Sequence, residues 1–191
     1  MDVMWPRSSE VIAHFEKVVN DRIEAVFTND KEHRACLTVP LQERDQRRVL
    51  CVIGQNPSLA DECEADKTLR YIEEYVFRKM PDFGVIKMLN VYSKVDTYKE
   101  KQIDLVRLAV EREVNRIRSA YTDFLIVTGK PLVQGGYDFP KRMRLLSSKL
   151  SGKNIYKINA GSDYPPHPGN PKITYSNFEY DPVAYNFEDI T

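Results

Sequence analysis

The run Val49-Leu50-Cys51-Val52-Ile53, followed by Gly54, decides the fold class of this 191-residue chain. It is continuously apolar and partly β-branched, which is typical of a strand buried on both faces of a sheet. Three more short apolar runs and three segments with helical spacing of apolar residues follow in alternation. The predicted strands are 85–89, 124–127 and 155–158, and the predicted helices are 66–79, 99–120 and 140–150. Alternation of this kind predicts a parallel sheet with helices on both sides.

We therefore expect an α/β fold, a three-layer sandwich with a mostly parallel central sheet of about four strands. The length suits a single domain over residues 1–191. Helical spacing over residues 8–26 predicts an additional N-terminal helix, and residues 33–41 are compatible with a further strand. The chain after Asn159 is rich in Pro, Gly, Asn and Tyr, and we expect it to be largely irregular.

Composition limits the classes of function. The 28 basic residues equal the 28 acidic ones, which disfavours strong non-specific binding to nucleic acid, although residues 141–153 form a local basic cluster. Three cysteines without CxxC spacing and three histidines predict neither a disulfide framework nor a metal site, and we expect no cofactor. No apolar run approaches the roughly 20 residues of a membrane helix, and no signal peptide is evident, so we expect a cytoplasmic protein without a membrane partner.

Polar residues follow the predicted strands, where the carboxyl ends of parallel strands meet and ligands commonly bind. Residues 54–58, with sequence Gly-Gln-Asn-Pro-Ser, follow the first strand, and Asn90 follows the second. A buried Asn90 amide needs both a donor and an acceptor, which the edge of a nucleobase or a neighbouring backbone would supply equally well. Asn56 presents an amide to a water or a ligand, or bonds the local backbone of an ordinary turn.

A proline-rich loop near the C-terminus carries the most distinctive histidine. Four prolines occur within residues 165–171, so this stretch forms neither a helix nor a central strand. A stiff loop of this kind would hold His167 ready for a ligand, the alternative being a rigid surface loop with an exposed imidazole. Further along the first loop, Asp66 is explained as a helix cap. Asp61 has no evident structural role, so it is a candidate site residue, and Arg70 can pair with either carboxylate.

In this order, these segments resemble the family known as domain of unknown function number 1643, over roughly residues 34–172. The four matching motifs are Gly54-Gln55-Asn56-Pro57-Ser58-Leu59-Ala60-Asp61, Asp66-Lys67-Thr68-Leu69-Arg70, Leu89-Asn90-Val91-Tyr92 and Tyr164-Pro165-Pro166-His167-Pro168. Together they are fairly specific, whereas any one alone is not. The last motif departs from the family pattern because Ser162-Asp163-Tyr164 replaces a glycine-led turn.

The same motifs are more distantly similar to the uracil-DNA glycosylase superfamily, which implies a fold and a pocket of that type. By this resemblance Asn56 would position the attacking water, Asn90 would contact the base and His167 would stabilise the departing base anion. Asn56 stands where a carboxylate would polarise water more strongly, and Asp61 is the alternative general base. The remaining candidate substrate-binding residues are Gly54, Gln55, Pro57, Ser58, Tyr92 and Arg70. Gly169-Asn170-Pro171 replaces the Ser-Pro with which glycosylases grip DNA.

Three functions remain open from the sequence. The first is a hydrolase that cleaves the N-glycosidic bond of a nucleobase in DNA or in a free nucleotide. The second is a non-catalytic protein that binds a nucleotide or nucleic acid, and the third is a hydrolase of an unrelated small ligand. Neutral net charge favours a small nucleotide over duplex DNA, whereas the basic 141–153 segment favours DNA.

Overall fold

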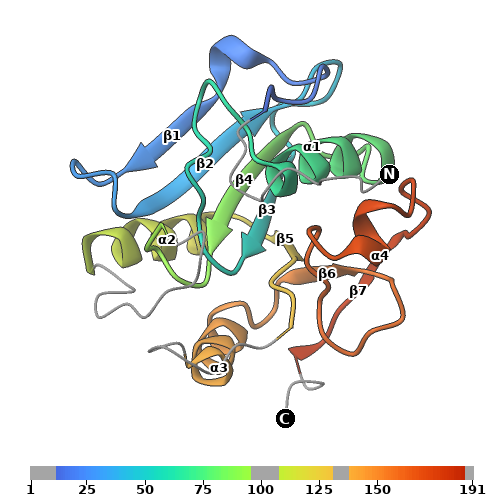
Figure 1. The fold of residues 1–191 in the computed structure, drawn as a ribbon. Helices are drawn as coiled ribbons and strands as arrows, with labels where there is room; N and C mark the ends of the chain where they lie inside the picture. The colour runs from blue at the N-terminus through green and yellow to red at the C-terminus, as the bar shows by residue number, and fades with distance from the viewer. Residues whose placement is uncertain (1–11, 96–107, 131–137, 188–191) are drawn as a thin grey trace, which may run out of the picture.

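The computed structural model describes residues 12–95, 108–130 and 138–187, and Figure 1 shows its fold. Its sheet has seven strands in the order β1-β2-β4-β3-β5-β6-β7. The strands are β1 Glu24–Phe27, β2 Arg34–Pro40, β3 Val49–Gly54, β4 Val85–Asn90, β5 Asp123–Ile126, β6 Asn154–Ile158 and β7 Pro182–Ala184. The helices are η1 Asn20–Arg22, α1 Lys67–Lys79, α2 Leu108–Ala120, α3 Phe139–Lys149 and α4 Pro171–Thr174.

The centre of the sheet is parallel and its flanks are antiparallel. The four strands β4, β3, β5 and β6 pair in parallel, and they are the four apolar runs identified in the sequence. β1 and β2 extend one side in antiparallel orientation, and β7 pairs antiparallel with β6 on the other. The expectation of a mostly parallel sheet of about four strands is therefore wrong. β2 agrees with the strand expected over residues 33–41. β1 and β7 are edge strands with half-exposed positions, so their sequences lack the continuous apolar signal of the run 49–53.

The predicted N-terminal helix over residues 8–26 is also wrong within the described residues, and residues 8–11 lie outside them. This stretch holds the short η1 and the strand β1. Besides short-range turn and 3-10 hydrogen bonds, its backbone bonds to distant segments: Ile12 exchanges hydrogen bonds with Ala65, and the amide of Val19 donates to the carbonyl of Pro40 at 2.9 Å. Phe15, Val18 and Ile23 are buried, but in a segment that is not an α-helix.

Helices cover both faces of the sheet, as expected. α1 packs on one face over alternate residues of the central strands, including Leu50, Val52, Ile86 and Leu125. On the other face α2 and α3 pack over the intervening residues, including Cys51, Ile53, Phe124 and Ile126. This alternation explains why the run 49–53 is apolar at every position.

The remaining elements match the prediction in part. The Asp66 side chain caps α1 by accepting from the amide of Leu69 at 2.6 Å. α2 confirms the described part of the helix expected over 99–120, and residues 99–107 lie outside the described residues. The tail contains two elements that were not predicted, α4 and β7. Within the described ranges, each helix falls short of the length and apolar character that a bilayer span requires.

The connections of the central strands diverge at their carboxyl ends. The chain leaves β3 toward α1 on one face, and it leaves β5 toward α3 on the opposite face. Where neighbouring parallel strands send their connections to opposite faces, the loops diverge and open a crevice at the carboxyl ends. The loops after β3 and β5, and that after β4 on the other side of β3, therefore frame the expected site.

Candidate functional site

The loop after β3 and the end of β4 are in direct contact. Gly54 and Asn90 are partners in the register of the two strands. The amide of Val91 donates to the carbonyl of Gly54 at 2.9 Å. A Cβ on Gly54 would lie 2.9 Å from Asn90 Nδ2 and 2.8 Å from Met88 Cε. The glycine is thus required so that the Asn90 side chain can lie against β3. Two of the motifs found in the sequence therefore meet here.

The Asn90 amide is held in one orientation by Arg34, a residue that the sequence reasoning missed. Asn90 is only 6% exposed, and its Oδ1 accepts from Arg34 Nη2 at 3.4 Å. Arg34 Nη1 donates to the carbonyl of Ala60 at 2.8 Å, so one guanidinium links β2, β4 and the loop after β3. Asn90 Nδ2 has no hydrogen-bond partner in the described part of the chain. In this buried amide, Oδ1 is engaged by Arg34, whereas the Nδ2 donor has no partner among the described residues.

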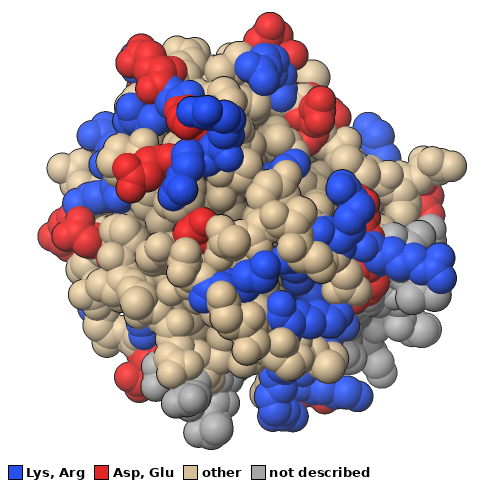
Figure 2. Space-filling view, turned by 180° about the vertical axis from the view of Figure 1, so that it is seen from behind, with Lys and Arg blue, Asp and Glu red and all other residues tan. Residues whose placement is uncertain are grey.

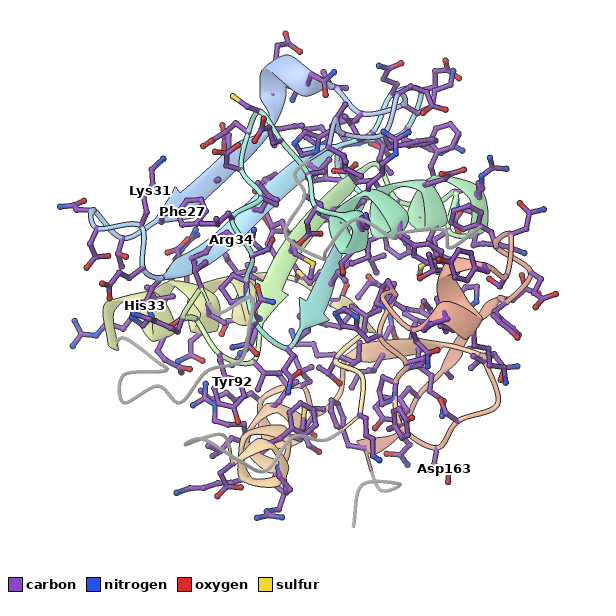
Figure 3. All side chains as sticks on the ribbon, viewed as in Figure 1. Phe27, Lys31, His33, Arg34, Tyr92 and Asp163 are labelled. Atoms are coloured by element: carbon purple, nitrogen blue, oxygen red, sulfur yellow. The ribbon has the colours of Figure 1, made fainter. Side chains whose placement is uncertain are left out.

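Arg34 is itself an unusual residue for this position. It is 4% exposed and forms no ion pair with the carboxylates of the described residues. Burial lowers the pKa of Arg34, although the nearby charge of Asp66 opposes this effect. Figure 3 shows Arg34 and His33 where β2 begins, and Tyr92 beyond the end of β4. Nothing in the sequence distinguishes Arg34 from a solvated arginine at a strand end, because its burial depends on the loop that covers it.

The proline-rich loop lies at the end of β5. The amide of Gly129, just after that strand, donates to the carbonyl of Pro165 at 2.9 Å. Gly129 has φ +78°, and a Cβ there would lie 2.8 Å from the Cβ of His167. Gly169 N–H donates to His167 Nδ1 at 2.9 Å. A neutral imidazole that accepts at Nδ1 carries its proton on Nε2, so Nε2 is the N–H donor of His167.

The sheet brings these pairs to one edge. Val127 N–H donates to the Ile53 carbonyl at 2.9 Å, which aligns the ends of β3 and β5. Neighbouring strands lie about 4.8 Å apart, so the ends of β4, β3 and β5 span about 10 Å. The loop that carries Asn56 leaves the middle strand of the three; Asn56 is half-buried, and its Oδ1 is buried. The ends of the three strands are thus aligned at one edge, and the joint site of Asn56, Asn90 and His167 and their chemical roles stay predictions.

Other candidate residues hold the local structure. Asp61 Oδ1 accepts from the amides of Cys63 at 2.9 Å and Glu64 at 3.2 Å, which explains this carboxylate as a turn acceptor. Arg70 Nη1 donates to two backbone carbonyls of the N-terminal segment, those of Ala13 and His14. Ser58 Oγ accepts from the amide of Ala60 at 3.3 Å. These contacts suit a structural role for Asp61, Ser58 and Arg70 better than contact with a ligand.

The rest of the predicted set is buried. Gln55 is buried, and its carbonyl accepts from Tyr92 N–H at 3.0 Å; Pro57 is buried beside it. Tyr92 packs in the core beneath α2 and α3, with the guanidinium of Arg142 5.8 Å from its ring centroid. Burial raises the pKa of Tyr92 to about 12, although the positive charge of Arg142 acts in the opposite direction. Tyr92 is therefore a neutral donor at physiological pH.

One further buried polar group lies at this edge and was not predicted. Thr128 directly follows β5 and is 1% exposed, and its Oγ1 has no hydrogen-bond partner among the described residues. Buried polar atoms nearly always find a partner, so an orphaned hydroxyl at a strand end indicates a place where water or a ligand is needed. A search of the described residues finds no cluster of three or more His, Cys, Asp or Glu side chains suited to a metal ion. The groups at the edge are amides, an imidazole and a guanidinium.

The fold and this edge define an α/β protein with divergent parallel-strand connections and a polar site at their carboxyl ends. Residues 34–168 match the family described as Protein of unknown function (DUF1643), and the match spans well over half of the chain. The chain belongs to this family. The matched region begins at Arg34 and ends at Pro168, so it contains the three loops of the edge. Comparison with the curated proteins and with the solved structures finds no match.

Proposed function

We propose that the carboxyl edge of β4, β3 and β5 binds a nucleobase and that the protein hydrolyses the N-glycosidic bond of the nucleoside or nucleotide that carries it. The observation on which this rests is the Asn90 amide, buried at the edge with no partner for Nδ2 among the described residues. A buried N–H donor is costly unless an acceptor meets it. A carbonyl oxygen or a ring nitrogen of a base supplies such an acceptor.

Arg34 sharpens this expectation. Because its guanidinium already donates to Asn90 Oδ1, the amide meets the ligand through its N–H group. The matching base atom is then an acceptor, such as the O4 of uracil or thymine, or the O6 or N7 of guanine. An exocyclic amino group in the same place would leave two donors facing each other. Asn90 would therefore select bases that place a hydrogen-bond acceptor opposite Nδ2.

The proposed reaction places one group on each side of the breaking bond. The oxygen of a water molecule bonds to C1′ of the sugar while the C1′–N bond breaks. The electron pair of the C1′–N bond goes to the base. Asn56 orients the water, and the Nε2–H of His167 donates to the base as negative charge develops on it. The proton of the water passes to solvent, because Asp61 is engaged by two backbone amides. Without a stronger base, hydrolysis is expected to be slow.

One observation favours a second candidate, a protein that binds a nucleotide without cleaving it. The turn after β3 carries Asn56 where a carboxylate would activate water, and the next acidic residue, Asp61, is used by the turn itself. The pocket would then be kept while the chemistry is absent. Both candidates share the base contact at Asn90, and they differ in whether free base is released.

A product assay separates the two candidates. The full chain is incubated with a panel of nucleosides, nucleoside monophosphates and uracil- or hypoxanthine-containing oligonucleotides, and free base is quantified by chromatography. We expect release to fall about 100-fold in His167→Ala, the usual effect of removing one donor to a developing anion. Asn56→Ala should also slow release, and Asn20→Ala, an exposed amide in η1, is the matched control.

The outcomes are distinct. Release that is unchanged in Asn56→Ala and His167→Ala would show that these residues do not perform the reaction. If no base is released, but binding to a nucleotide is lost in Asn90→Ala and kept in Asn20→Ala, the protein is the non-catalytic binder. If no member of the panel binds or reacts, the nucleobase proposal is wrong.

A further inference from the structure

A small hollow lies between α2 and α3, beyond the end of β4 and on the sheet face opposite Asn90. Half of the side chains that line it are basic. The lining residues are Val91, Arg118, Arg142, Leu145, Leu146 and Lys149. The lysine and the two arginines come from two different helices, so the tertiary structure gathers them. We propose that this hollow binds the phosphate group of a small phosphorylated ligand.

The cations of the hollow outnumber the carboxylates that face them. Glu111 of α2 is paired with Arg142, and its second oxygen lies 3.7 Å from Lys149 Nζ. Lys149 and Arg118 both donate to the side-chain oxygen of Asn115, at 2.8 Å and 3.4 Å, which supplies no charge. Three positive charges thus meet one negative charge in the described structure. Two positive charges remain, which matches the charge of a phosphate monoester dianion.

Part of this excess positive charge is buried, because it is carried by Arg118. It is only 5% exposed, and its Nε has no hydrogen-bond partner in the described ranges. Burial lowers the pKa of Arg118 to about 10; the charge of Glu111 counteracts this, while that of Arg142 lowers it further. A buried cation beside a like charge is stabilised by an anion. A guanidinium matches phosphate oxygens with two parallel N–H donors, so phosphate suits Arg118.

The surroundings favour a single phosphate group over a polyanion. Leu145 and Lys149 are exposed at the rim, so an anion reaches the basic side chains without opening the core. The chain as a whole has no net charge. Figure 2, the view from behind, shows Asp and Glu side chains among the Lys and Arg side chains on its upper left, and Lys and Arg side chains gathered across its centre and right. A nucleic-acid backbone needs phosphate contacts along its length, whereas the hollow offers a single group of three cations. The proposal does not depend on the nucleobase site.

Titration of the full chain tests the proposal. Orthophosphate, a nucleoside 5′-monophosphate, the corresponding nucleoside and chloride at equal ionic strength are compared by calorimetry. We expect both phosphates to bind, chloride not to bind, and any nucleoside binding to be unaffected by changes in the hollow. Lys149→Met should weaken phosphate binding about tenfold, as expected for the loss of one charged hydrogen bond. Arg144→Met, an exposed residue of the same helix, is the matched control.

A second variant protects the test from a folding defect. Arg118→Met removes the buried cation, and its folding is checked by circular dichroism; Lys149→Met changes an exposed side chain and should fold normally. Loss of phosphate binding in both variants, with the control unchanged, would support the site. Phosphate that binds no better than chloride would overturn it, as would equal loss in Arg144→Met. Binding of a single-stranded oligonucleotide without binding of orthophosphate would instead indicate a surface for nucleic acid.

Discussion

A buried ion pair between the N-terminal segment and α1 allows the sharpest test of the fold. Glu73 is 0% exposed, and its two oxygens accept from His14 Nδ1 at 2.6 Å and from Phe15 N–H at 2.8 Å. His14 Nε2 contacts the carbonyl of Asp61 at 3.0 Å, so the pair also holds the loop that follows β3. Both ring nitrogens therefore face acceptors, which is the arrangement of a protonated imidazole.

The expected cost of breaking the pair follows from its burial. Glu73→Ala leaves the His14 ring and the Phe15 amide without their acceptor, and removing one partner of a buried pair costs about 3–5 kcal/mol. At about 2–4 °C per kcal/mol for a chain of this size, the melting temperature should fall by about 6–20 °C. Glu74→Ala is the control, because Glu74 pairs with Arg78 near the surface of the same helix and should cost about 0.5 kcal/mol.

The neutral variant Glu73→Gln isolates the charge. The new amide can accept from Phe15 N–H and donate to Nδ1 of a neutral His14, whose Nε2–H still reaches Asp61, so every polar group keeps a partner. We expect a loss of about 1 kcal/mol or less near pH 8. Glu73→Gln thus changes the protonation of His14 with little change in packing.

The pH dependence has a definite sign. Burial alone would lower the pKa of His14, but the hydrogen bond and charge of Glu73, with the Asp61 carbonyl, outweigh it and raise the pKa above 6.5. The contribution of protonated His14 to the free energy of unfolding is fully present below pH 6.5, and it is lost as the pH rises through the raised pKa of the folded protein. Denaturation of wild type and Glu73→Gln from pH 6 to 9 should therefore show a gap that narrows with pH. A constant gap, or a cost of Glu73→Ala no larger than that of Glu74→Ala, would refute the reasoning.

Three further outcomes are expected. Gly54→Ala places a methyl group within 3 Å of Asn90 Nδ2, so it should lower the free energy of unfolding by about 1–3 kcal/mol and weaken ligand binding. Denaturation and ligand titration measure the two effects, and unchanged binding would contradict the contact. Iodoacetamide should label exposed Cys63 and spare buried Cys51, whose pKa burial raises to about 12; mass spectrometry of the native protein showing labelled Cys51 would disprove its burial. Asp66→Ala removes the cap of α1 and should lower stability in urea by about 1 kcal/mol; no change would mean that the cap is not needed.

Local signals were sufficient for the parallel centre of the fold and for the position of its loops. Runs such as 49–53 are apolar at every position because helices bury both faces, so they can be recognised without knowing their neighbours. The same argument placed Asn90 and the loop after Gly54 at one edge. Helical spacing failed over residues 12–26, where apolar side chains such as Val18 are buried in a segment whose backbone bonds elsewhere. The spacing of apolar residues indicates which side chains are buried, but it does not indicate which residues the backbone is hydrogen-bonded to.

The succession of the four central strands and their helices along the chain could be predicted from short stretches of sequence. Burial on two faces, a capping carboxylate and a helix-ending proline each act within a few residues. β1 and β7, the burial of Arg34 against Ala60 and the basic hollow around Arg118 arise only when separate segments meet. Their free energy comes from contacts between separate segments of the chain; Arg34 and Ala60, for example, are 26 residues apart. A side chain such as Arg34 is solvated or buried according to what covers it, and that is decided by the folded chain.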